Sequence, residues 1–329
     1  MSSAERPPAP APGSIDVVYT WVDGAAPGYQ QLLARHARTR FDADPSRTRD
    51  NLDLIRYSIR SLERFAPWVG RIFILTCRPQ VPAWLNRAEP RVQVIHHDEI
   101  MDGADLPTFN SLAIVSHLHK IPGLSSRFFY VEDDMLFLSP VTPADFISPH
   151  NRHYVFANPR HWAPQFRSAA ERRGQKPWNL ALSRSNDLLD AQFGHERRRQ
   201  VNHVPLLIEK QTWQEMLDIF AEAVRQTRAS RFRAEGNVAL EFIYPHFLRA
   251  RGLAEFASPE RQRESSGYLP LENFWPLTAW KLRAINRRRP KWVTMNDNFG
   301  AVANPIAEYM VRRCLEHWLP EPSRFEKRD

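Results

Sequence analysis

Residues Phe128-Phe129-Tyr130-Val131-Glu132-Asp133-Asp134-Met135-Leu136-Phe137 form an apolar, aromatic run typical of a strand, interrupted by three consecutive acids. Burying adjacent carboxylates without compensation is costly, so such acids usually bind a divalent metal, pair with arginine or lie at the exposed end of a strand. Mg²⁺ takes one or two protein carboxylates and leaves its other positions to water and substrate phosphates. The run therefore favours a phosphate-bearing substrate, with an ordinary solvated acidic turn as the alternative.

The sequence before this run alternates between strand-like and helix-like patterns. We expect strands at 15–21, 71–76 and 91–96, and helices at 28–38, from an Asp50 or Asn51 cap to Pro67, and at 108–120. This order predicts the α/β class, with a largely parallel, twisted sheet and helices on both faces. Such sheets bind ligands at the carboxyl ends of their strands, where Asp23 and the pair Asp133-Asp134 fall.

The second half of the chain changes character. Residues 158–200 are polar and arginine-rich with little periodicity, and we expect them to form an irregular segment over the active face. Helices should follow at 208–227, 237–250 and 305–319, with a strand at 292–295. We therefore expect a disordered tail at 1–14, one catalytic domain at 15–319 and a charged tail at 320–329. The domain would consist of an α/β core at 15–157, the irregular segment at 158–200 and a helical part at 201–319 that completes it.

Composition limits the possible environments and partners. The 329 residues contain no apolar stretch long enough to span a bilayer and no secretory signal, and two cysteines, Cys77 and Cys314, fit a reducing compartment. We expect a cytoplasmic protein, peripheral at most to the inner face of the membrane. The net charge is +8, but 39 of the 45 basic residues are arginines scattered along the chain, so nucleic acid is not an expected partner. The runs at 197–199 and 287–289 are solvated faces in our interpretation, although such runs can attract an anionic polymer or membrane.

Several ordered motifs resemble the Stealth family, the capsular-polysaccharide phosphotransferases related to the Golgi N-acetylglucosamine-1-phosphotransferase. The first is Ile15 to Gly24 (IDVVYTWVDG). The second block is longer and comprises Arg49-Asp50-Asn51, Arg56-Tyr57-Ser58, Arg60-Ser61-Leu62, Ala66-Pro67-Trp68, 80–85, 106–111 and Asp133-Asp134. The third is matched by His203, Pro205 and Arg233, and the fourth by Asn296-Asp297-Asn298.

This resemblance implies a nucleotide-sugar-transferase-like fold and a defined reaction. A sugar 1-phosphate would pass from a nucleotide-diphosphate sugar to a hydroxyl of an acceptor glycan, releasing nucleoside monophosphate during capsular or exopolysaccharide synthesis. Phosphoryl transfer requires positioning and charge neutralisation, by metal ions and arginine. We expect Mg²⁺ or Mn²⁺ on Asp133, Asp134 and Asp297, and phosphate clamps at Arg56 and Arg233. Membrane-associated export machinery is a possible further partner.

The matched motifs also suggest a general base. His203 is the candidate, because imidazole titrates near working pH, but it could instead bind a phosphate. Asp23 is the rival base, or a contact to the donor's nucleoside. The remaining motif residues are candidate contacts to donor and sugar, namely Trp21, Asn51, Asn110, Asn296 and Asn298.

Three departures from the family pattern involve this candidate site. Thr76-Cys77-Arg78-Pro79-Gln80 replaces a Thr-Asn-Gly-Gln loop and could alter donor preference, and Val115 replaces a glutamate. Glu132 stands where asparagine is common, and it either strengthens metal binding or faces away, since alternate strand residues point to opposite sides.

Two other classes of function fit the same residues. A metal-dependent glycosyltransferase would break the sugar C–O bond and release nucleoside diphosphate. A non-catalytic polyanion-binding protein would depend on its arginines and tolerate loss of Asp133 and Asp134.

Overall fold

The computed structural model describes residues 13–39, 41–43, 48–50 and 52–328. Its centre is a five-stranded sheet in the order β3-β2-β1-β4-β9. The strands are β1 (Asp16–Thr20), β2 (Ile72–Thr76), β3 (Val92–His96), β4 (Arg127–Glu132) and β9 (Leu206–Glu209). Strands β1 to β4 are parallel, with Val17 opposite both Ile72 and Phe129, and only β9 is antiparallel. The predicted α/β class with a largely parallel sheet is confirmed.

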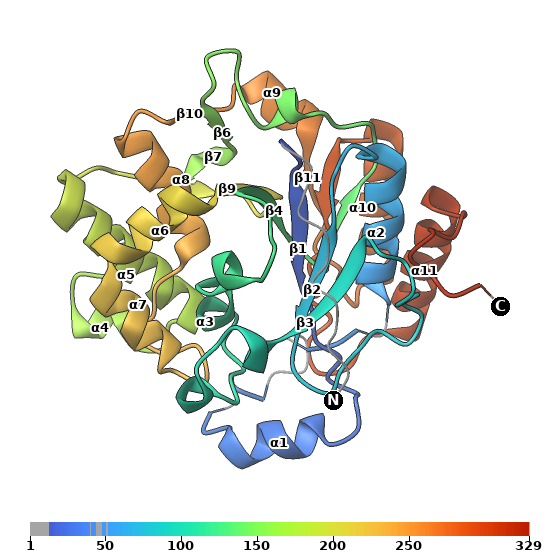
Figure 1. Ribbon diagram of the computed structural model, residues 1–329, viewed down its shortest axis with the longest axis horizontal. Helices are drawn as coiled ribbons and strands as arrows, with labels where there is room; N and C mark the ends of the chain where they lie inside the picture. The colour runs from blue at the N-terminus through green and yellow to red at the C-terminus, as the bar shows by residue number, and fades with distance from the viewer. Residues whose placement is uncertain (1–12, 40, 44–47, 51, 329) are drawn as a thin grey trace.

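Helices cover both faces of this sheet, as predicted (Figure 1). Side chains alternate along a strand, so Val18 and Phe73 pack into one apolar core while Val17 and Ile72 pack into the other. One face carries α3 (Ser111–Val115), α5 (Pro177–Phe193), α6 (Lys210–Ile219), α7 (Ala221–Arg228) and α8 (Leu240–Ala250). The other carries α2 (Leu54–Phe65), α10 (Trp275–Arg288) and α11 (Pro305–Trp318).

The acidic run separates into two strands that belong to different sheets. Strand β4 ends at Glu132, and β5 (Met135–Phe137) pairs antiparallel with β12 (Trp292–Thr294). Strand β11 (Ser266–Tyr268) completes this second sheet. Phe129 and Val131 before the acids share one apolar core with Met135 and Phe137 after them, and Asp133-Asp134 is the link between the two sheets.

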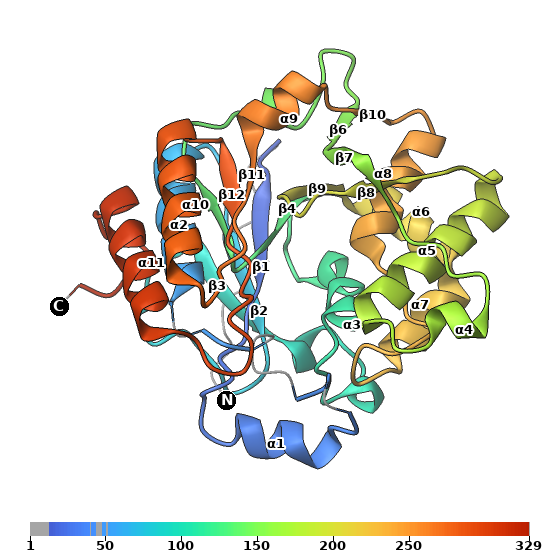
Figure 2. The same ribbon diagram turned by 180° about the vertical axis from the view of Figure 1, so that it is seen from behind.

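Smaller elements complete the structure (Figure 2). Two short sheets pair β6 with β10 and β7 with β8. The remaining elements are β6 (His153–Val155), β7 (Ala157–Trp162), β8 (Arg199–Val201), β10 (Ala254–Phe256), α1 (Tyr29–His36), α4 (Ala169–Arg172), α9 (Pro259–Ser265) and the 3₁₀ turns His97–Glu99, Gly103–Asp105, Leu118–Lys120 and Pro143–Asp145. None of the helices within the described ranges is both long enough and apolar enough to cross a bilayer.

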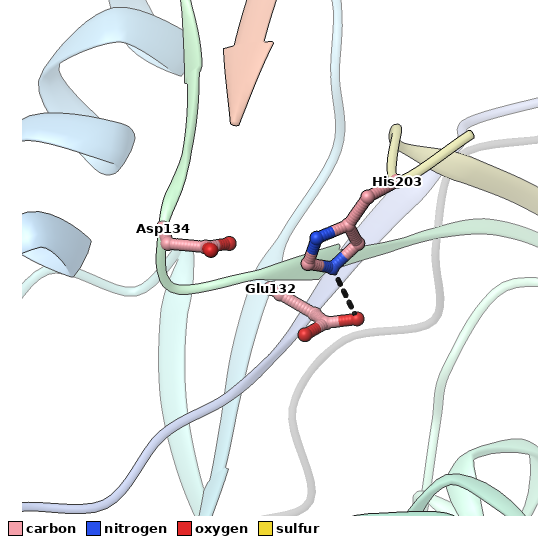
Figure 3. A group of neighbouring side chains, drawn as sticks. All are labelled: Glu132, Asp134 and His203. Atoms are coloured by element: carbon pink, nitrogen blue, oxygen red, sulfur yellow. Dashed lines mark ion pairs between the residues drawn. The ribbon is translucent and has the colours of Figure 1, made fainter. Parts of the chain in front are cut away.

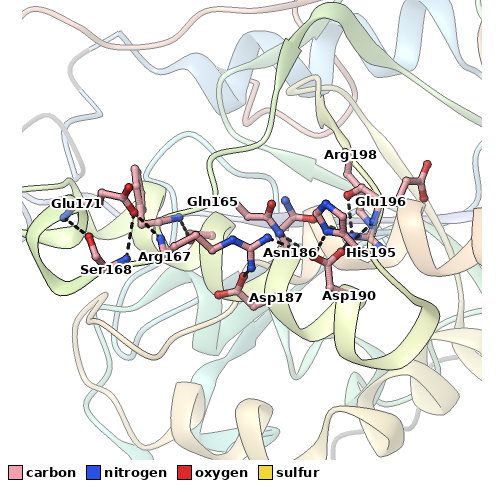
Figure 4. Close-up of polar contacts among 12 residues, drawn as sticks. Gln165, Arg167, Ser168, Glu171, Asn186, Asp187, Asp190, His195, Glu196 and Arg198 are labelled. Carbon is pink, nitrogen blue, oxygen red and sulfur yellow. Dashed lines mark hydrogen bonds and ion pairs between the residues drawn. The ribbon is translucent and has the colours of Figure 1, made fainter.

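The segment 158–200 is more regular than expected, because it contains the 17-residue helix α5. Asp190 on α5 holds the chain that follows the helix (Figure 4). Its carboxylate accepts hydrogen bonds from Gln165 Nε2 and His195 Nδ1, each at 2.8 Å, and pairs with the buried Arg198. The prediction of an irregular segment is wrong over α5.

Other element predictions also need correction. The helix expected at 108–120 is only the five residues of α3 followed by a 3₁₀ turn, and the one expected at 208–227 begins as β9 and divides at Phe220. The N-cap of α2 is Asp53, not Asp50, and Asn51 lies outside the described residues. Residues 320–328 pack onto the domain, because Phe325 is buried and Glu326 pairs with Arg60.

Candidate active site

A cavity of about 440 Å³ opens at the carboxyl ends of β1 and β4. Its walls include Trp21 after β1, residues 132–134 between β4 and β5, His203 before β9 and Arg233 before α8. Parallel strands bring their carboxyl ends to one edge of a sheet, which explains how segments far apart in sequence meet here. The cavity therefore combines acids, an imidazole and a guanidinium.

Glu132, Asp134 and His203 form the centre of the cavity, which we call the acid–imidazole cluster. One ligand atom from each residue lies within 4.8 Å of the others, and Glu132 Oε1 is 2.7 Å from His203 Nε2 (Figure 3). Thr294 on β12 donates a 2.7 Å hydrogen bond to the His203 carbonyl, so the second sheet holds the histidine's backbone. Both sheets thus contribute to the position of the cluster.

The charges in this cluster are strongly coupled. Burial alone would lower the pKa of His203, but the carboxylates of Glu132 and Asp134 raise it to about 10. Burial alone would raise the pKa of Glu132, but the imidazolium lowers it. The side chains of Glu132 and His203 each keep 32% of their surface exposed, so water moderates both effects. Without another cation, His203 is therefore the positive partner of the acids.

The positive charge of His203 compensates the neighbouring acids only in part. Burial raises the pKa of Asp134 to about 6 and of Glu241, on α8, to about 7, and burial with the charge of Asp134 raises that of Asp133. Among the described atoms, Asp134 Oδ1 and Glu241 Oε2 are buried without a hydrogen-bond partner. Orphaned carboxylate oxygens are costly unless a cation or proton neutralises them. The donor set therefore fits a divalent cation, with carboxylate oxygens suited to Mg²⁺ and the imidazole nitrogen also suited to Mn²⁺.

Arg233 enters the cavity from the loop that precedes α8. Its Nε and Nη2 donate to Ser111 Oγ at 3.2 and 2.5 Å, and its guanidinium lies 5.4 Å from the centre of the Trp178 ring. The loop itself is held by Asn110, whose buried amide donates to Asn237 Oδ1 and to the Ser230 carbonyl. Asn110 thus supports the loop that carries Arg233, and it is not among the residues that line the described cavity.

Comparison with known proteins identifies the family. Models of Stealth protein conserved regions 2 and 3 match residues 47–155 and 202–250. An exopolysaccharide phosphotransferase of Streptomyces coelicolor is 39% identical over 322 residues, covering 95% of this chain and 57% of the relative. The capsular polysaccharide phosphotransferase fcs1 of Haemophilus influenzae is 30% identical over 251 residues, covering 73% of this chain and 67% of the relative. The chain belongs to the Stealth family.

This Stealth chain spans little more than half the length of three Streptomyces coelicolor exopolysaccharide phosphotransferases that it matches. Weaker likenesses occur among solved structures. The bifunctional glycosyltransferase WbbM has a TM-score of 0.46 at 10% identity, covering 94% of this chain and 50% of that one. The galactosyltransferase LgtC has a TM-score of 0.43 at 13% identity, covering 94% and 98%.

The matched Stealth regions contain most of the cavity's polar groups. Region 2 includes Glu132, Asp133 and Asp134, and region 3 includes His203 and Arg233. Asn296 and Asp297 also line the cavity, but Asp297 is 3.0 Å from Arg49 and accepts from the Phe299 N–H. The structure therefore places Asp297 in an ion pair at the rim, outside the acid–imidazole cluster.

Other predicted residues lie elsewhere in this Stealth protein. Arg56 faces a separate hollow and pairs with Glu326 at 2.5 Å, so the structure does not bring it to the cavity. The Asp23 carboxylate accepts from the Ala25 N–H in a turn, and Asn298 is exposed and accepts from Asn296. Among described residues, neither Asp23 nor Asn298 lines the cavity.

The structure adds residues that sequence reasoning missed as site residues. Asp50 accepts a 2.7 Å hydrogen bond from the Trp21 indole, and burial raises its pKa to about 7. Its place in a matched motif was a usable signal, but we interpreted it as a helix cap. Lys176, just before α5, also lines the cavity, and nothing in its polar surroundings marked it. Glu241 does not line the described cavity, but its charge acts on Glu132 and His203, and it was hidden in an apolar helical pattern.

Proposed function

We propose that this chain transfers a sugar 1-phosphate from a nucleotide-diphosphate sugar to a hydroxyl of an acceptor glycan. The attacked atom is phosphorus, so the leaving group is a nucleoside monophosphate. The observation that carries the proposal is one cavity holding Asp133 and Asp134, whose Oδ1 has no hydrogen-bond partner among the described atoms, beside His203 and Arg233. The names of the Stealth relatives, exopolysaccharide and capsular polysaccharide phosphotransferases, support the same reaction class.

The acids would hold a divalent cation, Mg²⁺ or Mn²⁺. Glu132 and Asp134 are the proposed ligands, with Asp133 beside them, while His203 is kept for the proton transfer described below. When bound, such a cation neutralises charge on the diphosphate oxygens. Asp297, which pairs with Arg49, is not retained in this ligand set.

Arg233 is the proposed clamp for the phosphate oxygens. A guanidinium offers two parallel N–H donors to a phosphate, and Ser111 and Trp178 hold this one in place. Lys176 adds a second positive charge at the same cavity. These groups stabilise the charge that develops on the transferred phosphoryl group.

His203 is the proposed general base. The negative charges of Glu132 and Asp134 raise the pKa of His203. A cation that neutralised these carboxylates would remove their effect and lower that pKa. The neutral imidazole can then accept the proton of the acceptor hydroxyl, with Glu132 orienting the ring. Trp21, Asp50 and Asn296 line the remaining wall and are proposed contacts to donor or sugar.

An assay of nucleotide products tests this proposal. Purified protein is incubated with a panel of nucleotide-diphosphate sugars, Mg²⁺ or Mn²⁺ and mixed glycan acceptors, and the nucleotides are separated. We expect acceptor-dependent nucleoside monophosphate that is lost with a chelator and in Asp134→Asn and His203→Ala. The matched control, Asp187→Asn on the outer part of α5, should remain active.

Release of nucleoside diphosphate would instead indicate a glycosyltransferase that breaks the sugar C–O bond. Activity that survives Asp134→Asn, or any product formed without a divalent cation, would contradict the proposed site. As a setting for the reaction, we propose the cytoplasm beside membrane-associated export machinery. The two unpaired cysteines, Cys77 and Cys314, support a reducing compartment.

A further inference from the structure

Helices α10 and α11 and the residues just before them carry a group of exposed apolar side chains. They belong to Phe274, Trp275, Trp280, Val302, Ile306 and Tyr309, which we call the α10–α11 surface. These are six of the ten large apolar residues exposed in the described parts of the chain, and Phe274, Trp280 and Tyr309 each expose more than 60% of their surface. Exposed apolar groups scattered singly are normal, but a gathering of this kind indicates an interaction site.

The two helices form one rigid support for these side chains. They lie side by side and begin at the same place, where Asn273 donates to the Val302 carbonyl at 2.9 Å and accepts from the Asn304 N–H at 2.7 Å (Figure 2). Their inner faces are buried, with Leu282 of α10 and Val311 of α11 in the same apolar core. The outer side chains therefore cannot turn inward, and a partner can be entered only by the side chains themselves, not by the helices.

The charge of the surface indicates what it contacts. Helix α10 carries four cations and no acid; Lys281 pairs with Glu272 just before the helix and Arg288 donates to the Ser266 carbonyl, which leaves Arg283 and Arg287. Arg283 and Arg287 follow Trp280 at helical spacing on the exposed face, and no ion pair is recorded for either within the described structure. On α11, Glu316 pairs with Arg313, which leaves Glu308 in its first turn. The surface is aromatic and positive.

We propose that the α10–α11 surface docks on an anionic phospholipid bilayer. Tryptophan and tyrosine rings insert at the level of the headgroups, and arginines pair with their phosphates. A second copy of this chain fits less well, because a two-fold interface would bring the same arginines together. Asn296 and Asp297 line the catalytic cavity a few residues before Val302, so docking would place that cavity next to the membrane.

Vesicle sedimentation tests the proposal with the whole protein. We expect binding to phosphatidylcholine vesicles containing 30% phosphatidylglycerol, and at least about tenfold weaker partitioning at high salt and in Arg283→Gln/Arg287→Gln. Trp280→Ser/Ile306→Ser should weaken binding similarly, while its matched control Ile219→Ser/Leu253→Ser, at exposed apolar residues elsewhere, should bind like the wild type. All sites are exposed, and circular dichroism checks that the variants fold.

Three results would overturn the proposal. One is no partition into the anionic vesicles, and another is unchanged binding by the aromatic variant, which would assign binding to net charge alone. The third is self-association that disappears in Trp280→Ser/Ile306→Ser without vesicle binding, which would identify a second copy as the partner. None of these readouts depends on transferase activity.

Discussion

Arg233 shows how one side chain can be tested apart from the fold. Lysine keeps the charge but loses the fork that matches phosphate, so Arg233→Lys should lower kcat/KM about 100-fold. The unfolding free energy should change by less than about 1 kcal/mol, because Arg233 is only part-buried. Steady-state kinetics with the donor found in the product assay, together with urea unfolding, measure both quantities.

The neighbouring Arg231→Lys is the control for this variant. Arg231 is exposed and contacts His36 Nδ1 at 3.3 Å, and it is not among the described residues that line the cavity. Wild-type kinetics are expected for it. Equal losses in the two variants would show that general positive charge, rather than a phosphate clamp, accounts for the effect.

At the scale of single residues, the sequence predicted the centre of the site better than its rim. Asp134, His203 and Arg233 meet in one cavity because they follow the strand ends and loops that the motifs marked. Glu132 could not be assigned, because a strand residue can point to either face until the neighbouring sheet is known. Arg56 resembled a clamp only through its motif, and its partner Glu326 lies 270 residues away.

Among the elements, the loop before α8 depends on a buried amide. Asn110→Ala would remove its hydrogen bonds to Asn237 Oδ1 and the Ser230 carbonyl and the acceptor for the Leu112 N–H, at a cost of about 2 kcal/mol. Because this loop carries Arg233, activity should also fall at temperatures where the variant remains folded. Circular dichroism and kinetics on the same sample measure both effects, and full activity of folded Asn110→Ala would show that the loop keeps its position without the amide.

The C-terminal segment 320–328 is fastened by one carboxylate. Glu326 is 2% exposed and pairs with Arg56 and with Arg60, which is itself buried. Glu326→Ala would leave the Arg60 guanidinium without its counter-charge and should destabilise the protein by about 3 kcal/mol in urea unfolding. The exposed pair Arg313–Glu316 gives the control, since Glu316→Ala should cost less than about 0.5 kcal/mol. Similar values for the two variants would contradict this view of the segment.

Helices and strands were predictable where their buried residues form a regular apolar pattern in the sequence. Helix α2 buries Ile55, Ile59 and Leu62 at helical spacing, and β2 is entirely buried, with four apolar residues in succession. Helix α5 could not be seen this way, because Ser183, Ser185 and Asn186 are among its buried residues and weaken the apolar pattern. Strand β9 runs directly into α6, so the predicted helix begins two residues too early, at Ile208 instead of Lys210.

The whole molecule should respond to acid through two opposed sets of buried groups. Burial lowers the pKa of His246 to about 4. Above pH 6.5 the imidazole is neutral in both the folded and the unfolded chain, so it does not change the free energy of unfolding. Below pH 6.5 only the unfolded chain gains the proton, so stability is lost as pH falls. Asp50 and Glu241, with pKa values raised by burial to about 7, act in the other direction. The net pH dependence is therefore flatter than the histidines alone would give.

A histidine variant separates the two sets. Relative to the wild type, His246→Phe should become more stable by about 1 kcal/mol between pH 6.5 and pH 5.5, because the unfolded variant has no imidazole to protonate. Urea unfolding at pH 7.5, 6.5 and 5.5 measures the difference, with the exposed His150→Phe as the control. Parallel curves for His246→Phe and the wild type would show that His246 is not held neutral by the fold.

The passage of the chain from one sheet to the other at Asp133-Asp134 affects how this protein can diversify. Val131 and Met135, the buried residues that flank Glu132 to Asp134, share one apolar core but belong to different sheets, so insertions at this point would disturb both sheets. The acids are therefore a fixed point of the architecture, while Lys176 and Trp178 reach the site from a peripheral segment that tolerates change more easily. Under the proposed function, different sugars or acceptors would be accommodated by changes in that wall, while the acids proposed to act on the phosphate stay in place.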